Sequence, residues 1–186
     1  MIRQSLYRLS RILALVAFLS IIPISSTAAQ EAPSPKPIDL ACATDMSSQL
    51  LGATPIGDGS QTLISARVIF GPNGSLGAHT HPGTLVATIE SGSLGFTLLE
   101  HGEMTVSRSA TDGAEASQEP IAMGEEVSLD PGDGFVEMGM IHSARNLSNE
   151  PTTVLLSGLV ATGQPLTACA DVSQAPEGIA PINFIH

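Results

Sequence analysis

A pair of histidines one residue apart, His79 and His81, offers the plainest chemistry in this sequence. Side chains two positions apart on a β-strand point to the same face, so these two imidazoles can chelate one metal ion. Histidine is scarce here, with five among 186 residues, and two of the five form this pair. Taken alone the pair is weak evidence for a metal site, because such pairs also arise by chance on protein surfaces. The surroundings strengthen the metal interpretation, because Gly77 precedes the pair, Pro82-Gly83 turns the chain after it, and an apolar strand over residues 85–89 follows.

Short β-strands separated by glycine and proline are the elements that would position these side chains. Between residues 62 and 160, apolar and β-branched runs alternate with turn signals such as Gly71-Pro-Asn-Gly74, and no long amphipathic helix interrupts them. This pattern predicts an all-β barrel or sandwich. The expected strands are Thr62–Phe70, Thr84–Glu90, Leu94–Leu99, Met104–Arg108, Glu126–Leu129, Gly134–Met138, Ser143–Leu147 and Thr153–Val160, with a hairpin loop over Ser109–Glu119.

The spacing of glycines and histidines resembles the two motifs of the cupin superfamily. The first motif has a glycine, His-x-His, a glutamate and a second glycine, and the second has a glycine, Pro-x-Gly, a histidine and an asparagine. The matching residues are His79, His81, Gly92, Gly139, His142 and Asn146, with the leading glycines, Gly74 and Gly132, each one residue out of place. The resemblance covers residues 62–160 and implies a cupin-type double-stranded β-helix, or jelly-roll barrel, in which His142 joins the histidine pair.

One departure from the family pattern concerns the glutamate that binds metal in cupins. Its position is occupied by Leu85, which cannot coordinate an ion. Glu90 lies an odd number of residues further along the strand and is expected on the opposite face, so it is not assigned. Glu137, which replaces the proline of the second motif, is a second and weaker candidate.

The resemblance thus implies a centre of three imidazoles, His79, His81 and His142, for a divalent transition metal. Such ligands suit Fe, Mn, Zn, Ni, Co or Cu, so the metal is left open. Without a carboxylate, the charge of the ion would favour an anionic ligand. The family includes dioxygenases with three-histidine sites, so dioxygenase-like or isomerase-like action on a small molecule is one interpretation. The alternatives are a non-catalytic barrel that binds a small ligand and a structural barrel with a vestigial metal site.

No catalytic residue is assigned, because the sequence contains no identifiable general base, nucleophile or cofactor motif. Arg145 is expected to pair with a surface acid, and Asn146 to bond backbone groups at a strand end. Met138 and Met140 are expected to line the pocket.

The start of the chain has the composition of a secretory signal peptide. Three arginines precede a short apolar run over residues 12–22, and small residues follow up to Ala29. That run is shorter than the ~20 residues that a membrane-spanning helix needs. We expect residues 1–29 to be removed and the mature protein to be exported, to the periplasm or outside the cell, with no membrane attachment.

The mature chain would be acidic and contain two cysteines. Export would leave four of the seven basic residues and all 18 acidic ones, a formal charge of −14, which argues against nucleic-acid binding. An even number of cysteines in an exported chain predicts a disulfide between Cys42 and Cys169. The expected organisation is an extended N-terminal segment over 30–60, a barrel over 61–163, and a tail over 164–186 that this disulfide ties back. The family resemblance also makes a homodimer an expectation.

Overall fold

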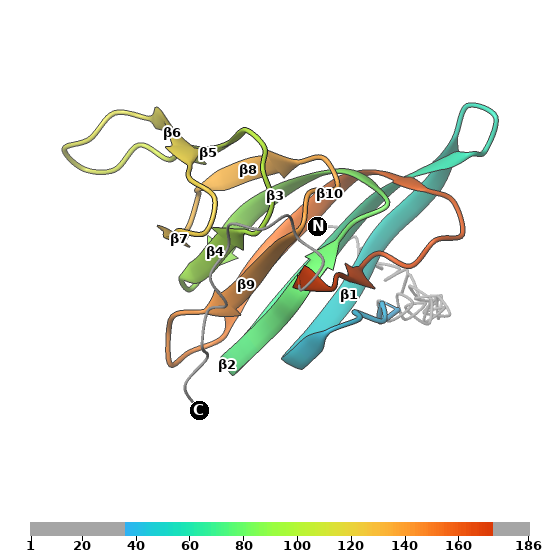
Figure 1. Ribbon diagram of the computed structural model, residues 1–186, viewed down its shortest axis with the longest axis horizontal. Helices are drawn as coiled ribbons and strands as arrows, with labels where there is room; N and C mark the ends of the chain where they lie inside the picture. The colour runs from blue at the N-terminus through green and yellow to red at the C-terminus, as the bar shows by residue number, and fades with distance from the viewer. Residues whose placement is uncertain (1–35, 173–186) are drawn as a thin grey trace, which may run out of the picture. The chain divides into compact units, whose positions relative to one another are not determined.

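The computed structural model describes residues 36–172, which fold into one β unit. The expected signal peptide, residues 30–35 and the end of the tail from residue 173 lie outside the described residues. No helix in the described range is long and apolar enough to cross a membrane. The strands in this range are β1 Ala43–Ile56, β2 Gln61–Thr80, β3 Gly83–Ser91, β4 Leu94–Leu98, β5 Met104–Arg108, β6 Ser117–Ile121, β7 Glu126–Leu129, β8 Gly134–Glu137, β9 His142–Asn146, β10 Thr152–Ala161 and β11 Ala168–Cys169 (Figure 1).

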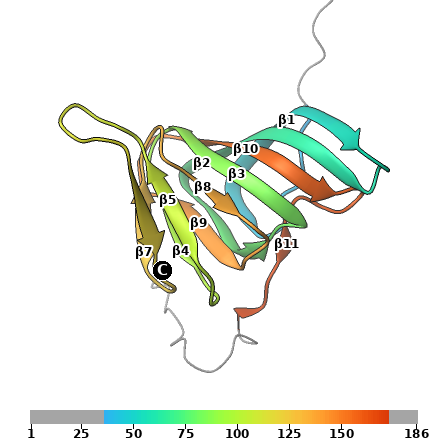
Figure 2. The same ribbon diagram turned by 90° about the horizontal axis from the view of Figure 1, so that it is seen from above.

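The strands form a nearly closed antiparallel barrel, which confirms the all-β prediction. Their order is β6-β5-β8-β3-β10-β2-β9-β4-β7, and β1 and β11 both pair with β2 outside this path. The first half of β2, Gln61–Phe70, pairs with β10, whereas the second half, from Ser75 to His79, pairs with β9. The long strand β2 therefore joins β10 and β9, its two neighbours in the strand order, at different points along its length. Figures 1 and 2 both show β1 alongside β2, and the loop between β5 and β6 projecting away from the other strands.

Alternation of side chains along each strand places the core inside the barrel. On β3, Leu85, Ala87 and Ile89 are buried, and Glu90 lies outside, where its carboxylate accepts hydrogen bonds from the Arg67 guanidinium at 2.6 and 3.0 Å. Because residues two apart on a strand share a face, the burial of these three residues shows which positions of β3 point into the barrel. Position 85 is one of them, and position 90 is not, as the sequence predicted.

Several parts of the fold differ from the sequence prediction, which contained neither β6, starting inside the expected loop over Ser109–Glu119, nor β11, in the expected tail. Strand β1 lies in the segment expected to be merely extended, and its residues are mostly exposed, so it lacks the apolar alternation that marks a half-buried strand. The stretch from Gly71 to Gly74, predicted as a turn, instead forms a bulge within β2. Gly74 is required there, because a Cβ atom at this position would lie 2.7 Å from the carbonyl oxygen of Asp45.

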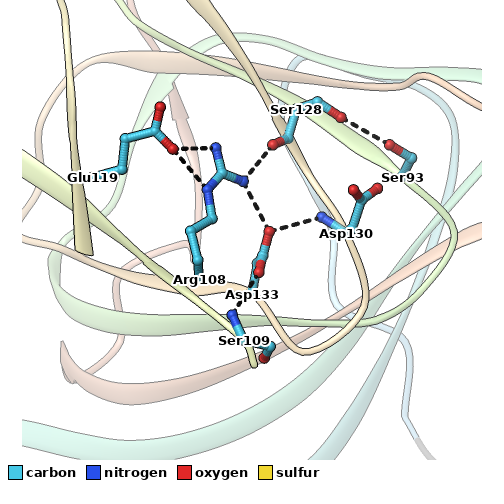
Figure 3. Close-up of polar contacts among 7 residues, drawn as sticks. All are labelled: Ser93, Arg108, Ser109, Glu119, Ser128, Asp130 and Asp133. Atoms are coloured by element: carbon cyan, nitrogen blue, oxygen red, sulfur yellow. Dashed lines mark hydrogen bonds and ion pairs between the residues drawn. The ribbon is translucent and has the colours of Figure 1, made fainter. Parts of the chain in front are cut away.

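A charged network holds β5, β6 and the turn before β8 together (Figure 3). Arg108 lies between two carboxylates, at 2.8 Å from Asp133 and 2.8 Å from Glu119. The buried carboxylate of Asp133 also accepts the backbone N–H groups of Ser109 and Asp130. Paired in this way, the buried charge fixes the turn that leads into β8. The remaining contacts in Figure 3 join Arg108 to the Ser128 carbonyl at 2.6 Å and Ser93 to the Ser128 hydroxyl at 3.1 Å.

Candidate metal centre

The fold brings the three predicted histidines together inside the barrel. His79 on β2 and His142 on β9 are direct cross-strand partners, and His81 follows one residue after β2 ends. All three side chains are buried, with exposures of 1%, 3% and 6% for His79, His142 and His81. One ring nitrogen from each lies within 4.8 Å of the others, close enough for a single ion to contact all three.

Backbone carbonyls fix how each imidazole is oriented. The Nδ1 atom of His79 lies 2.8 Å from the Gly77 carbonyl, and that of His142 lies 2.8 Å from the Met140 carbonyl. A carbonyl oxygen can only accept a hydrogen bond, so each Nδ1 carries the ring hydrogen and donates it. The same holds for His81, whose Nδ1 donates to the Leu166 carbonyl at 2.7 Å. In the neutral rings, Nε2 is therefore left with a free lone pair, the state that binds metal.

Burial keeps these imidazoles neutral. It lowers the pKa of His79, and it lowers that of His142 well below the ordinary value, with the charge of His79 adding to the effect on His142. Burial, together with the nearby His79, lowers the pKa of His81 to about 4. Neutral imidazoles need not lose a proton before they bind an ion, so the cluster is ready to act as a ligand set at neutral pH.

A carboxylate also lies beside two of the three rings, that of Glu137, which the sequence indicated only as a weaker candidate. Glu137, at the end of β8, is only 1% exposed. Its Oε1 lies 3.2 Å from the His81 Nε2, and its Oε2 lies 3.0 Å from the His142 Nε2. Oε2 nevertheless has no hydrogen-bond partner in the described structure. Burial raises the pKa of this carboxyl to about 8.

Glu137 reaches the site because of how β8 pairs with β3. It is the cross-strand partner of Leu85, the residue at the family's glutamate position. The sequence shows that a glutamate lies in the second motif, but it does not show how β3 aligns with β8. For this reason Glu137 was only a weaker candidate in the sequence analysis. That register is the signal that would have identified it.

The disulfide predicted between Cys42 and Cys169 is present and lies beside the histidines. Cys169 on β11 is the cross-strand partner of His79, and the Gly77 N–H donates to the Cys42 carbonyl at 3.1 Å. The segment just before β11 provides the Leu166 carbonyl that holds His81. The predicted tail is thus tied down beside the site by both a covalent bond and a hydrogen bond.

The site opens onto a small apolar cavity of about 40 Å³. Among residues 36–172, its polar lining groups are the three histidines, Glu137 and Thr167, and no lysine or arginine of this range contributes to the lining. The aliphatic and aromatic lining comes from Leu40, Val68, Phe70, Leu76, Ala87, Leu94, Phe96, Phe135, Ala144, Val154 and Leu156.

Other residues singled out in the sequence have structural positions. Arg145 pairs with the surface carboxylate of Glu126 at 2.6 Å, and the Asn146 amide donates to three backbone carbonyls, both as predicted. Met140 packs against the core. Met138 is 66% exposed, so the prediction that it lines the pocket was wrong: in the turn after β8 its side chain faces solvent.

Comparisons with known proteins give matches among solved structures. No protein-family model and no curated protein sequence matches the chain. A protein with a double-stranded β-helix domain from Klebsiella pneumoniae subsp. pneumoniae is 19% identical, with a TM-score of 0.42 over 66% of this chain and 82% of that one. A cupin 2 conserved barrel protein from Rhodopseudomonas palustris is 16% identical, with a TM-score of 0.40 over 74% and 77% of the two chains. The polyketide cyclase RemF from Streptomyces resistomycificus is 19% identical, with a TM-score of 0.43 over 76% and 84%.

The strand order and the interior histidines define the class of this protein. A nearly closed antiparallel barrel holds the histidines of both motifs on facing positions of β2 and β9. The chain is therefore a β-barrel protein with a three-histidine cluster suited to a metal ion, and its barrel is similar to those of double-stranded β-helix proteins.

Proposed function

We propose that this protein is an exported cupin that binds a divalent transition metal through His79, His81 and His142 and presents the ion to a small molecule inside the barrel. The observation that carries the proposal is the arrangement of ring nitrogens. Each Nδ1 donates to a backbone carbonyl, which leaves the Nε2 lone pair of each ring free, and one ring nitrogen of each histidine lies within 4.8 Å of the others in a buried site. A cation satisfies all three at once, whereas empty space leaves buried polar atoms without partners.

The residues present fit such an ion by two independent criteria. Imidazole nitrogen is a ligand that Fe, Mn, Zn, Ni, Co and Cu all accept, which leaves the metal open. The buried Glu137 Oε2, which has no hydrogen-bond partner, adds an anionic oxygen at the same place. When bound, an ion of this kind would act as a Lewis acid toward an oxygen atom of a ligand.

The shape and polarity of the cavity support a small ligand with an apolar body. The volume of about 40 Å³ exceeds the roughly 10–15 Å³ that a cavity needs to hold one water molecule, so a small ligand has room there. With no cationic side chain in the lining, only the metal centre could neutralise a negative charge. The carboxylate of Glu137 would offset part of the charge of a divalent ion, so a ligand would have less positive charge to neutralise than at a site of three imidazoles alone.

Export is supported by two features of the chain. Disulfides such as Cys42–Cys169 form and persist in oxidising compartments and are rare in the cytosol. The basic, apolar and small-residue order of residues 1–29 matches a signal peptide.

A vestigial metal site is the competing function, and one observation favours it. Because burial raises the pKa of Glu137 to about 8, the carboxyl can hold a proton at neutral pH and donate it to one of the neighbouring Nε2 atoms. The cluster would then be a structural hydrogen-bonded group in a barrel that binds a small ligand without turnover or serves only as a scaffold.

Elemental analysis of the purified protein separates these two functions. We expect wild-type protein to contain close to one transition-metal ion per chain and His81→Ala to lose it while keeping the circular dichroism spectrum of a folded β protein. His101→Ala is the matched control, since His101 is exposed in the turn between β4 and β5 and should leave the metal content unchanged. A wild-type protein that holds no metal after incubation with Mn²⁺, Fe²⁺ or Zn²⁺ would establish the vestigial alternative.

A further inference from the structure

The surroundings of Glu137 differ from those of Asp133, the other buried acid in the described residues. A buried carboxylate is costly unless it is paired, and the described structure places no lysine or arginine in contact with this one. By contrast, the buried carboxylate of Asp133 is paired with Arg108 and accepts two backbone N–H groups. The barrel therefore has the means to neutralise a buried acid, yet it leaves Glu137 against two imidazoles.

Those imidazoles cannot act as donors toward Glu137 in their neutral form. The Nε2 atoms of His81 and His142 hold lone pairs, because the Nδ1 atoms donate to backbone carbonyls. The contacts of 3.2 and 3.0 Å thus bring acceptors against acceptors. One proton can relieve one of these contacts. A single metal ion relieves both, and it also engages the Nε2 of His79.

Strand register explains how a carboxylate arrives at this point from an unexpected place in the chain. Cross-strand partners in an antiparallel pair point to the same face, with Cβ atoms about 4.5–5.5 Å apart. Glu137 and Leu85 are such partners on β8 and β3. A glutamate on β8 can therefore direct its carboxylate into the same region as a glutamate at position 85 on β3.

We infer that Glu137 is the fourth protein ligand of the metal centre and takes over, from the neighbouring strand, the role that position 85 has in the family pattern. The inference rests on the proposed function, since it requires that an ion binds at the histidines. It also narrows the ligand class. Three neutral imidazoles and one carboxylate leave a divalent ion with one positive charge, so a monoanionic oxygen donor on an otherwise apolar molecule would neutralise the site. A dianion would bring uncompensated charge into an apolar cavity.

Binding of Mn²⁺ alone to the full mature chain tests the inference, followed by isothermal titration calorimetry after removal of bound metal with a chelator. Glu137→Gln keeps the size of the side chain but cannot ionise, and we expect it to weaken Mn²⁺ binding by at least about 100-fold, the upper end of what loss of a supporting group costs. Glu90→Gln, on the outer face, is the matched control and should bind as wild type does. The d–d absorption spectrum of bound Co²⁺ should also change in Glu137→Gln, because the ligand set differs.

A swapped variant tests the register argument directly. Glu137→Leu should lose Mn²⁺ affinity as Glu137→Gln does. The double variant Leu85→Glu, Glu137→Leu should bind Mn²⁺ at least tenfold more tightly than Glu137→Leu, because position 85 on the partner strand β3 then provides the carboxylate. Thermal unfolding of each metal-free variant verifies that the barrel is folded.

The possible results distinguish a failure of the Glu137 inference from a failure of the proposed three-histidine metal site. If Glu137→Gln binds Mn²⁺ as tightly as wild type and gives the same Co²⁺ spectrum, while His81→Ala loses binding, Glu137 is no ligand and the three-histidine function stands. If wild-type protein binds no metal at all, both proposals fail. A folded swapped variant that binds no better than Glu137→Leu would overturn the equivalence of positions 85 and 137.

Discussion

At the scale of single residues, the centre is defined by which atom of each imidazole carries the hydrogen. The acceptors for the three Nδ1–H groups are all backbone carbonyls, those of Gly77, Met140 and Leu166. Metal-binding histidines are often oriented by a carboxylate side chain, which a single substitution can remove. Here the orientation depends on the path of the backbone, so it survives any substitution that leaves the local fold intact.

The opposite pKa shifts of Glu137 and the histidines predict how the metal-free protein responds to pH. The unfolded carboxyl titrates near 4.5 and the folded one near 8, so the stabilisation from this group is complete below 4.5 and is lost as pH rises through 8. The histidine pKa values are lowered from 6.5, so their contribution is lost as pH falls below 6.5. With three histidines against one carboxyl, stability should be greatest near pH 6.5 and should fall at higher pH.

Chemical denaturation in the presence of a chelator measures this effect. Between pH 6.5 and 8.5 we expect the free energy of unfolding to fall by on the order of 2 kcal/mol. Over the first ~1.5 pH units of this range the folded Glu137 carboxyl still holds its proton, and unfolding releases it, so each pH unit lowers the free energy of unfolding by about 1.4 kcal/mol. Glu137→Gln has no group to titrate in this range and should show no such loss. Equal losses in the two proteins would mean that Glu137 is not the group responsible.

At the scale of elements, the end of the chain holds one side of the site. The tail reaches β2 as the short strand β11, and the disulfide joins it to the residue preceding β1. From this tail come the carbonyl that orients His81 and the cavity-lining Thr167. The disulfide therefore stabilises the environment of a proposed ligand as well as the fold.

We expect the double variant Cys42→Ser, Cys169→Ser to lose both stability and metal affinity. The cysteines are 127 residues apart, and closing so long a loop contributes up to about 4–5 kcal/mol in the chain-entropy model. Metal affinity should fall as well, because a loosened tail no longer holds the Leu166 carbonyl against His81. Urea unfolding and Mn²⁺ titration measure the two effects, and reduced wild-type protein should behave as the variant does. Unchanged Mn²⁺ affinity in the variant would show that the tail does not support the site.

At the scale of the whole molecule, an ion at the proposed centre would join parts of the barrel that no hydrogen-bonded ladder joins directly. His79 and His142 lie on the adjacent strands β2 and β9, whereas Glu137 lies on β8, separated from β2 by β3 and β10 in the strand order. We therefore expect bound metal to stabilise the barrel as one cooperative unit.

Thermal unfolding with and without metal checks this. At a free Mn²⁺ concentration 100 times the dissociation constant, binding to the folded state alone stabilises by about 2.7 kcal/mol. The midpoint should rise in a single transition for wild type and remain fixed for His81→Ala. Two separate transitions, only one of them sensitive to metal, would contradict the idea that the ion links β8 to the adjacent strands β2 and β9.

Much of the fold could be predicted from the sequence because most strands carry local signals. The strands from β3 to β5 and from β7 to β10 were placed within a residue or so of their observed ends, since apolar alternation and glycine or proline turns mark them. Strands β1, β6 and β11 have mostly exposed residues and were missed. β1 and β6 pair with their neighbours in the chain, β2 and β5, and β11 pairs with the distant β2, but none of the three carries the apolar alternation that marks a half-buried strand.

The site was predictable to the same extent. His79 and His81 follow from alternation on one strand, and His142 from its motif spacing. Glu137 depends on the register between β3 and β8, a long-range property that a linear pattern lacks.

The near-complete enclosure of the four groups has a consequence for how the protein would acquire its metal. None of His79, His81, Glu137 and His142 is more than 6% exposed, so an ion among them has almost no direct contact with solvent. Metal uptake would be easiest while the chain is still folding, before the strands of the barrel enclose the four groups. Imidazole and carboxylate ligands discriminate weakly among these metals, and availability decides occupancy. The compartment in which the chain folds, rather than the ligands themselves, would then select the metal.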